Sequence, residues 1–232
     1  MIAEQYGLVY KRVTIDDIEL IRYWRNQPFI RDAMQFKEYI TPEMQLKWFE
    51  SINNKENYYF LIETEGKPVG LINCKNADPV TREAEGGIFI WDLDYWNTPI
   101  PVFAALTMLE GVFEIFGASG ASTATVAQTN AKALQFNKML GYEVIKGTEN
   151  NEFIKLILTK DRYLEKTAKL KKAAHLYCNN HSKLKLTLTE SDDLLSDEMI
   201  AYFRKKKLII LRAWYRIRLF HKSRATVLSD KL

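Results

Sequence analysis

The chain has 232 residues, of which 47% are hydrophobic and 27% are charged, and its formal net charge is +4. This composition is typical of a soluble globular protein with a core of normal size. Cys74 and Cys178 fit no metal or redox spacing, which favours a reducing, cytoplasmic setting. No apolar run is long enough for a spanning helix, and no signal-peptide pattern follows Met1.

The net charge divides unevenly along the chain. Residues 161–232 contain 17 Lys+Arg and 8 Asp+Glu, whereas residues 1–160 contain 16 basic and 21 acidic residues. A mildly acidic domain over 1–160 is therefore expected to carry a basic extension over 161–232.

The first part of the chain predicts a strand followed by two helices. Residues 8–14 (LVYKRVT) alternate apolar and polar side chains, as in a half-buried strand. A helix is expected next, because two aspartates place negative charge at its N-terminus, and it ends at 24–26 (WRN). Pro28 predicts an extended or turn segment. A second helix begins at 41–44 (TPEM), with proline in its first turn.

A hairpin, a long apolar helix and further strands are expected after this. Residues 58–63 and 69–73 flank a Gly-containing turn, as the two strands of a hairpin do. The remaining expected elements are a strand over 85–91, a helix over 101–116, a strand over 121–127, a helix after Asn130, a strand that restarts at Tyr142 and a strand over 153–158. Residues 8–160 thus predict the order β-α-α-β-β-β-α-β-α-β-β.

The stretch 125–142 (TVAQTNAKALQFNKMLGY) gives the clearest local prediction. Asn130 is a good N-cap, because its side-chain oxygen can accept a hydrogen bond from an unpaired amide of the first helical turn. Gly141 stands where a helix C-terminus favours positive φ, and Tyr142 restarts a strand. The expected apolar face of this helix consists of Ala133, Phe136, Met139 and Leu140. Such a capped helix is also common in any α/β domain.

The pattern N-x-x-A-x-x-F-x-x-x-L-G-Y resembles the closing helix of the GNAT family of N-acetyltransferases, and the order of elements agrees with that family. The segments 21–28 (IRYWRNQP), 58–62 (YYFLI) and 66–70 (GKPVG) are most similar to the RimJ/RimL-like branch, and within it to nucleotide-sugar amine N-acetyltransferases. The resemblance implies an α/β GNAT fold, with a mixed sheet of about six to seven strands flanked by helices. It also implies acetyl-CoA as the acyl donor, without a metal.

The expected donor loop departs from the family pattern. In GNAT proteins, backbone N–H groups between a strand and the next helix bind the CoA pyrophosphate, within the pattern [QR]-x-x-G-x-[GA]. The aligned residues 96–101 (WNTPIP) place Pro99 and Pro101 at both small positions, and proline has no N–H to donate. The resemblance leaves the amides of Thr98, Ile100, Val102 and Phe103 for the phosphates, and places Asn130 and Asn137 beside the pantetheine.

Three interpretations of this loop are open. The site binds CoA through fewer amides, it binds a different activated acyl donor, or the domain has lost catalysis. The first is favoured, because the Asn130 helix is intact and the helix dipole still attracts phosphate.

The resemblance also assigns chemical roles. Acyl transfer from a thioester to an amine needs a base, donors to the oxyanion and an acid for the leaving thiolate. Glu85 matches an acidic residue of aminosugar acetyltransferases and is the predicted base, with Asp92 as the alternative; an edge-exposed glutamate is the plainer interpretation of Glu85. The amides of Ile90 and Trp91 are expected to polarise the acetyl carbonyl. Many family members have a tyrosine acid where this chain has Asn137, so the acid is unassigned.

The acceptor is expected at the end of the first helix. Arg25 could hold a phosphate or carboxylate bidentately, and Trp24 could stack on a sugar or base. Asn26 belongs to the same segment, and Met34 could line the adjoining apolar wall. A core tryptophan beside a surface arginine is an equal alternative. All three histidines lie beyond residue 160, which disfavours a His-dependent mechanism or a metal site.

The extension over 161–232 is predicted to be mainly helical. Residues 161–180 are Lys-rich, residues 184–188 alternate, and a capped helix is expected from Ser196 to about Lys222. Aromatic residues among many bases over 196–222 are typical of a helix at a membrane interface. Docking on the domain or on a second subunit is an equal alternative, and nucleic-acid binding is disfavoured.

The resemblance therefore implies an acyl-CoA-dependent N-acetyltransferase that acts on a small amine, such as an amino group of a nucleotide-linked sugar in surface-polysaccharide biosynthesis. It would work in the cytoplasm or at the inner face of the membrane, and a homodimer is compatible with it. Transfer to a protein N-terminus is not separable by sequence. The rival is a non-catalytic GNAT-fold module that binds a protein partner or a membrane, favoured by Pro99, Pro101 and Asn137.

Overall fold

The structure is a computed structural model that describes residues 1–188 and 216–219. Its centre is one mixed sheet of ten strands. From edge to edge the strands are β10 (Arg216–Leu219), β9 (Lys185–Leu188), β1 (Ile2–Gln5), β2 (Leu8–Arg12), β3 (Tyr58–Thr64), β4 (Lys67–Lys75), β5 (Ala84–Ile90), β6 (Ala121–Ala127), β8 (Phe153–Thr159) and β7 (Glu143–Val144). The expected mixed sheet flanked by helices is confirmed, although it has more strands than the six to seven expected, because short strands are added at both edges.

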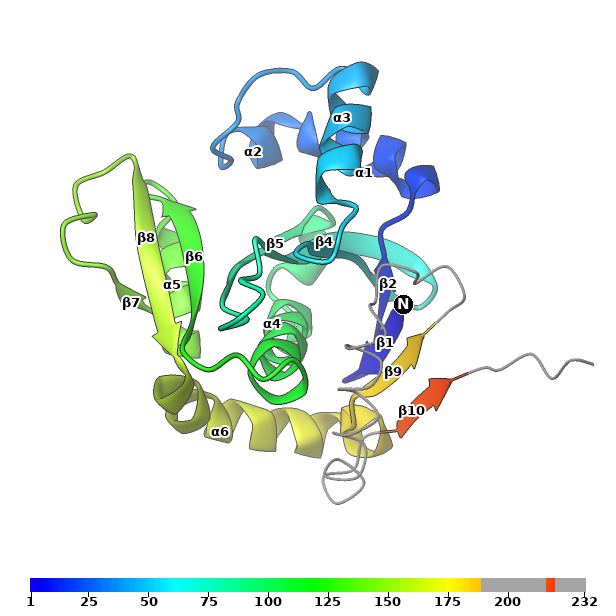
Figure 1. The fold of residues 1–232 in the computed structure, drawn as a ribbon, viewed down its shortest axis with the longest axis vertical. Helices are drawn as coiled ribbons and strands as arrows, with labels where there is room; N and C mark the ends of the chain where they lie inside the picture. Colours follow the sequence, from blue (N-terminus) through cyan, green and yellow to red (C-terminus); the bar gives the residue numbers. More distant parts are fainter. Residues whose placement is uncertain (189–215, 220–232) are drawn as a thin grey trace, which may run out of the picture.

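Six helices accompany the sheet in the described part of the chain. They are α1 (Ile18–Arg25), α2 (Pro28–Arg31), α3 (Pro42–Ile52), α4 (Ile100–Glu110), α5 (Ala131–Leu140) and α6 (Lys160–Cys178). Figure 1 shows α1, α2 and α3 together at the top of the view, α6 along the bottom, and α4 between them. None of these helices combines the length and the apolarity that a bilayer crossing requires.

Proline and threonine set the starts of the helices near the N-terminus. Thr41 caps α3 by accepting a hydrogen bond from the Met44 amide at 3.2 Å, as its position before Pro42 predicts. Pro28 was expected in an extended or turn segment, but it opens the short helix α2. The extended residue is Gln27 instead, because the clash with the proline ring restricts the residue before it.

The predicted capped helix is present as α5. Asn130 Oδ1 accepts from the Ala133 amide at 3.0 Å, and Gly141 ends the helix at φ 103°. A Cβ at Gly141 would lie 2.9 Å from Lys166 Cβ, so glycine is required there both for its φ and for the close approach of α6. Met139, predicted on the buried face, is 43% exposed, and Leu134 packs on the core in its place.

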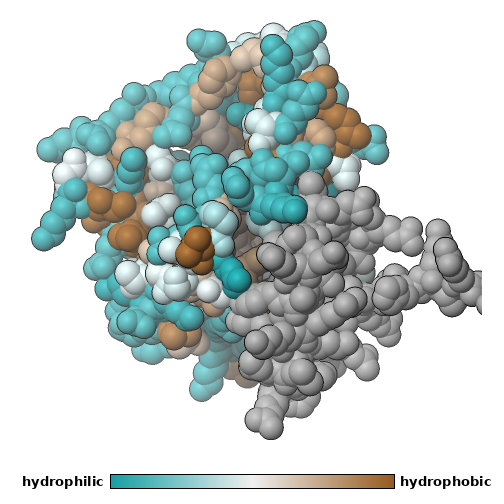
Figure 2. Space-filling view, in the orientation of Figure 1, coloured by the Kyte–Doolittle hydropathy of each residue, from teal (hydrophilic) through white to brown (hydrophobic). Residues whose placement is uncertain are grey.

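Two apolar clusters lie on opposite faces of the sheet. The larger one joins the strands to α4 and α6 and contains Leu106, Leu109 and Tyr163. The smaller one lies under α1 and α3 and contains Ile21 and Trp91. Both faces of the central strands are therefore covered by helices. On the described part of the surface in Figure 2, hydrophilic residues predominate and hydrophobic ones form small separate groups.

The start of the predicted extension packs directly on this domain. Helix α6 confirms the helix expected over 161–180, and its Tyr163 ring stacks on Phe113 at 4.7 Å. Glu114, in the π-helical turn that follows α4, accepts hydrogen bonds from Tyr163 and Lys171 of α6. β9 then pairs with β1 in antiparallel orientation.

The helix expected from Ser196 to about Lys222 is wrong for residues 216–219. These residues form strand β10, which pairs in parallel with β9. The sequence RIRL alternates basic and apolar residues, and this period of two suits a strand better than a helix. The rest of that prediction lies outside the described residues.

Candidate functional site

Strand β5 is paired very differently on its two sides. Six residue pairs join it to β4, from Lys75–Glu85 to Gly70–Ile90. Only two pairs, Ala84–Ser122 and Glu85–Thr123, join it in parallel to β6, which then continues along β8 for seven pairs. The two parallel strands therefore diverge after Glu85 and leave a split between β5 and β6.

The backbone amides of β5 alternate between its two neighbours. The Trp91 amide donates to the Val69 carbonyl of β4 at 3.0 Å. Because amides alternate in direction along a strand, those of Ile88 and Ile90 point the other way, into the split. The position of Ile90 therefore suits its predicted role of polarising an acetyl carbonyl.

Trp91 is not available for the same role. Its amide is bonded to Val69, and the Asp92 amide shares that carbonyl at 3.4 Å. The indole is 2% exposed, donates from Nε1 to the Pro68 carbonyl at 3.0 Å, and stacks on Trp24 with centroids 5.9 Å apart and planes 7° apart. Trp24 itself packs in this cluster, which agrees with the alternative of a core tryptophan.

Most of the amides expected to bind phosphate already have partners within the protein. The Thr98 amide donates to the Tyr95 carbonyl at 3.2 Å, and the Ile100 amide donates to the Thr98 hydroxyl at 3.3 Å. The Phe103 amide donates to the Pro99 carbonyl at 2.9 Å. Among the bonds recorded for described residues, none occupies the amide of Val102. The proline loop thus offers fewer donors than a glycine-rich one.

Asp92 has a structural role in this structure. Its carboxylate lies 2.6 Å from Lys67 Nζ and caps the 3₁₀ turn Leu93–Tyr95 through the Asp94 amide at 3.3 Å. The hydrogen bond from Lys67 lowers the pKa of Asp92, which makes its carboxylate a weaker base. Asp92 is therefore a poorer base candidate than Glu85.

Glu85 lies at the point where the strands diverge. It is half-buried and forms an ion pair with Lys75 at 3.3 Å. Because side chains alternate along a strand, Glu85 shares its face of β5 with Phe89 and Trp91, under α1 and α3. The side chain is therefore next to the split and on the face where the acceptor residues were predicted.

The predicted acceptor residues lie on this same face. Arg25 extends from α1 with its guanidinium over the Trp48 ring at 5.5 Å. Met34 packs on the apolar cluster that contains Trp24 and Trp91. Trp24, Arg25 and Met34 thus lie on the same side of the sheet as Glu85.

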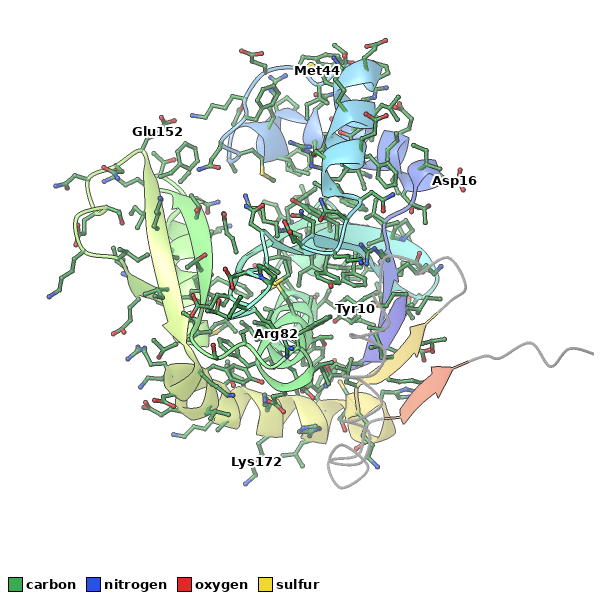
Figure 3. The ribbon with its side chains drawn as sticks, viewed as in Figure 1. Tyr10, Asp16, Met44, Arg82, Glu152 and Lys172 are labelled. Atoms are coloured by element: carbon green, nitrogen blue, oxygen red, sulfur yellow. The ribbon has the colours of Figure 1, made fainter. Side chains whose placement is uncertain are left out.

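Asn26 holds the connection between α2 and α3. Its Nδ2 donates to the Ile40 carbonyl at 2.9 Å, and its Oδ1 accepts from the Ile40 amide at 2.8 Å. Further along the same connection, Lys37 Nζ lies 2.6 Å from Glu152 Oε1, just before β8, whose tip approaches α2 (Figure 3). Asn26 therefore positions a segment that reaches across to β8.

Two residues beside the proline loop were missed by the sequence prediction. Lys132 Nζ of α5 lies 5.8 Å from the centroid of the Trp96 ring, and Phe29 of α2 packs on the same ring at 6.4 Å. Lys132 is exposed, so it adds an accessible positive charge near the start of α4. The only feature of the sequence that could have indicated a phosphate-binding role for Lys132 was its position as the second residue of the predicted helix.

Among the residues that the structure describes, the polar side chains near the split are bonded or buried in ways that do not suit a general acid. Asn137 donates from Nδ2 to the Ala133 carbonyl of its own helix at 2.9 Å. The Tyr142 hydroxyl is buried and hydrogen-bonded to Ser122 at 2.9 Å, and burial raises the pKa of Tyr142. Burial also raises the pKa of Cys74 to about 12, which suits a packed thiol rather than a nucleophile.

A cavity of about 400 Å³ lies on the other face of the sheet, between the strands and the C-terminal half of α4. Its lining is mainly apolar and includes Tyr10, Phe60, Ile72, Met108 and Leu186. Arg82 lies at its border and, like Tyr10, lies near α4 in Figure 3. Most of this lining lies on the face of the sheet opposite Glu85 and Arg25, but Asn73 also borders the cavity. Within residues 1–188 and 216–219, no group of three or more His, Cys, Asp or Glu side chains is placed to hold a metal ion.

Comparison with known proteins agrees with this architecture. An uncharacterized protein of Methanocaldococcus jannaschii is 25% identical over 156 residues, which are 66% of this chain and 31% of that protein. The chain thus matches less than a third of that relative's length.

Two solved structures share the fold. The apo structure of FdhC, described as a nucleotide-linked sugar GNAT, has a TM-score of 0.61 at 21% identity and covers 73% of this chain and 96% of its own. Spermidine N-acetyltransferase from Vibrio cholerae, solved with CoA and spermine, has a TM-score of 0.58 at 15% identity. The match covers 68% of this chain and 98% of that one. The sequence model of the acetyltransferase (GNAT) domain family matches residues 8–143, which is more than half of the chain. The chain therefore belongs to the GNAT family of acetyltransferases.

Proposed function

We propose that this protein is an acyl-CoA-dependent N-acetyltransferase whose acceptor is an amino group of a nucleotide-linked sugar. The observation that carries the proposal is the split between β5 and β6, which begins at Glu85 and exposes the Ile88 and Ile90 amides along one edge. An extended pantetheine arm can lie along such an edge and bond to these amides as a neighbouring strand would.

The pyrophosphate of the donor would lie at the start of α4. The Val102 amide and the dipole of α4 offer a partial anion site there, and Lys132 adds a full positive charge nearby. A lysine charge can take over part of the role that glycine amides have in the family pattern, because both attract phosphate oxygens. This arrangement supports CoA binding through fewer amides.

Glu85 would then act on the acceptor amine. The acceptor reacts as its neutral amine, and Glu85 takes the one proton that the nitrogen loses as it bonds to the thioester carbon, either directly or through a water molecule. The nitrogen forms a bond to the thioester carbon, and the Ile90 amide stabilises the oxyanion. The C–S bond breaks, and the CoA thiolate leaves and takes a proton from solvent, since no side chain of this site is arranged to supply one.

The sugar-nucleotide assignment is supported by three features. The segment 21–28 is similar to that of nucleotide-sugar amine N-acetyltransferases, FdhC shares the fold, and indole and guanidinium groups lie on the acceptor face. A polyamine acceptor is the competing assignment, because spermidine N-acetyltransferase shares the fold with a TM-score of 0.58, against 0.61 for FdhC.

A non-catalytic module is the rival from another class. It is favoured by the occupied amides of Thr98, Ile100 and Phe103. A transfer assay separates these options. Purified protein and acetyl-CoA are incubated with a panel of aminosugar nucleotides, polyamines and peptides, and the release of free CoA thiol is measured. Acetylation of an aminosugar nucleotide that is lost in Glu85→Gln is expected. Transfer only to peptides or polyamines would discard the sugar assignment, and no transfer with any amine would favour the module.

Contact with the inner face of a membrane through residues 196–222 is a separate proposal that rests on sequence alone. Flotation with anionic liposomes, using the full chain and a chain that ends at residue 195, measures it. Recovery of both forms in the soluble fraction would contradict the proposal.

A further inference from the structure

We infer that the acceptor face contains an anion subsite formed by Arg25 with Tyr59 and Asn73, so that the acceptor amine carries a phosphate or carboxylate group. The inference rests on the proposed transferase function and specifies the charge of its substrate. It assigns a role to polar side chains that have no partner within the described protein.

Arg25 lies on the buried side of its helix. Ile18, Ile21 and Arg25 follow each other at spacings of three and four residues, so they share one face of α1. Ile21 on that face is 0% exposed. The Arg25 side chain is thus directed toward the sheet, where it lies over the Trp48 ring at 5.5 Å.

Arg25 also lacks a negatively charged partner. Nearby arginines are paired, since Arg22 lies 2.6 Å from Glu19 and Arg31 lies 4.0 Å from Asp32. For Arg25, no carboxylate in the described part of the chain lies within ion-pair distance. Burial lowers the pKa of Arg25, which reflects the cost of holding the guanidinium away from water. A negatively charged ligand would offset that cost with bidentate hydrogen bonds.

Tyr59 contacts the same Trp48 ring that Arg25 lies over, and Asn73 is paired with Tyr59 in the sheet. Tyr59 of β3, Asn73 of β4 and Gly87 of β5 form one row across the sheet. A Cβ at Gly87 would lie only 2.8 Å from Asn73 Oδ1, so the Asn73 amide extends across β5 at that point. Tyr59 is near enough to both Arg25 and Glu85 for their charges to affect its pKa.

The side chains of Tyr59 and Asn73 are free to bind a ligand. Neither makes a side-chain hydrogen bond to any residue that the structure describes. The Tyr59 ring packs edge-on against Trp48 at 5.3 Å, and burial raises the pKa of Tyr59 to about 12. The hydroxyl therefore stays protonated at neutral pH and can donate to an anionic oxygen.

The subsite distinguishes the two acceptor classes suggested by the fold. An uncompensated guanidinium attracts phosphate or carboxylate oxygens and repels a polyamine, whose charges are all positive. The amino group of an anionic acceptor would reach Glu85 while its anion lies at Arg25. The side chain thus acts as a specificity-determining residue rather than as a catalytic one.

A matched series of acceptors tests this inference. Glucosamine, glucosamine 1-phosphate, muramic acid and UDP-glucosamine present the same amine with no anion, a phosphate, a carboxylate and a diphosphate. Wild-type protein is expected to have a lower KM for the anionic members. Arg25→Gln should raise those values at least about tenfold, the scale of a charged hydrogen bond, and leave the KM for glucosamine unchanged. The phosphate and carboxylate arms show which oxyanion is preferred.

Two further variants keep the test independent of folding. Tyr59→Phe removes only a hydroxyl and should raise the KM for anionic acceptors severalfold at unchanged melting temperature. Lys47→Gln removes an exposed positive charge next to Trp48 and should leave all values unchanged. Equal KM values across the series, or an equal loss for glucosamine in Arg25→Gln, would overturn the inference and leave Arg25 as a packing residue.

A binding measurement separates this result from the proposed function. Glucosamine 1-phosphate is titrated calorimetrically into the protein saturated with CoA. Binding that weakens at least about tenfold in Arg25→Gln supports the subsite even if no acetyl transfer occurs. Binding that is absent or unchanged by the substitution contradicts it. Absence of transfer to every amine bears on the transferase proposal alone.

Discussion

Strand β6 pairs along its length with one neighbour, β8, and over only a short stretch with the other, β5. Seven residue pairs join it to β8, whereas two join it to β5. The first pairing satisfies the β6 backbone groups that point toward β8 and forms part of the core. The second leaves the Ile88 and Ile90 amides of β5 without a strand partner, although the Ile90 carbonyl accepts from Trp96 Nε1 at 2.8 Å. The unpaired edge therefore shows where function is placed in an otherwise closed sheet.

The two faces of the central strands differ in a similar way. On the α4 face, some polar side chains are paired, as in Tyr10 with Thr107 at 3.2 Å and Gln5 Nε2 with Glu110 at 3.0 Å, whereas Gln5 Oε1 and the Tyr6 hydroxyl are buried without a partner among the described residues. On the face under α1 and α3, Arg25, Tyr59 and Asn73 have no such partners among the described residues. Polar side chains that make no hydrogen bond within the protein but can reach a ligand are candidates for its binding site.

The largest effect is expected from Glu85, the last β5 residue paired with β6. Glu85→Gln keeps the shape but removes the base, so kcat should fall by about 10²- to 10⁴-fold. Steady-state release of CoA thiol measures it. Glu50→Gln, at an exposed position of α3, is the matched control and should retain full activity. A Glu85→Gln protein with unchanged kcat would remove Glu85 from the mechanism.

The geometry of the split depends next on Gly70. A Cβ there would lie 2.7 Å from the Phe89 carbonyl and 3.1 Å from Ile90 Cα, so the backbone of β5 must move. Gly70→Ala is expected to destabilise the fold by about 1–3 kcal/mol, measured by denaturant unfolding. Gly111→Ala, where nothing lies within 4 Å of the added Cβ, should be neutral or slightly stabilising. Equal effects of the two substitutions would show that the close approach at Gly70 is unimportant.

A smaller effect is expected at the donor phosphates. Lys132→Gln should weaken CoA binding by about three- to tenfold, less at high salt, because an exposed charge contributes little and is screened. Calorimetry at low and high ionic strength measures this. Lys138→Gln, near the other end of α5, should have no effect. An unchanged affinity in Lys132→Gln would leave only the Val102 amide and the helix dipole for the phosphates.

The smallest expected effect is an increase in the affinity for CoA. Pro101→Ala restores an N–H in the first turn of α4, where Pro101 now stands. One added amide at a helix N-terminus should tighten CoA binding severalfold. Pro79→Ala, in the exposed loop before β5, serves as the control for loss of a proline. Weaker binding in Pro101→Ala would mean that the proline shapes the loop for the donor.

The sequence predicted the elements whose signals are local. The strand over 121–127 and the Asn130–Gly141 helix were found because alternation, a capping side chain and a glycine stop all lie within a few residues. The helix start at Pro28 and the strand at 216–219 were missed, because short segments carry two patterns at once and tertiary pairing decides between them.

The sequence predicted only part of the candidate site. Glu85 could be placed from a family resemblance, but the loss of the Trp91 amide to Val69 depends on the register between β4 and β5. The row of Tyr59, Asn73 and Gly87 depends on the same register, which no single strand reveals. Pairing across strands, rather than composition, determines which polar groups are left for a ligand.

Hydrogen exchange of individual β5 amides, with and without acetyl-CoA, tests the central claim most directly. In the free protein, the Ile88 and Ile90 amides should exchange quickly, because they face the split, and those of Gly87 and Phe89 should exchange slowly, because they face β4. Saturating acetyl-CoA is predicted to slow Ile88 and Ile90 strongly and to leave the other two unchanged. Acetyl-CoA that binds without protecting these two amides would contradict the account.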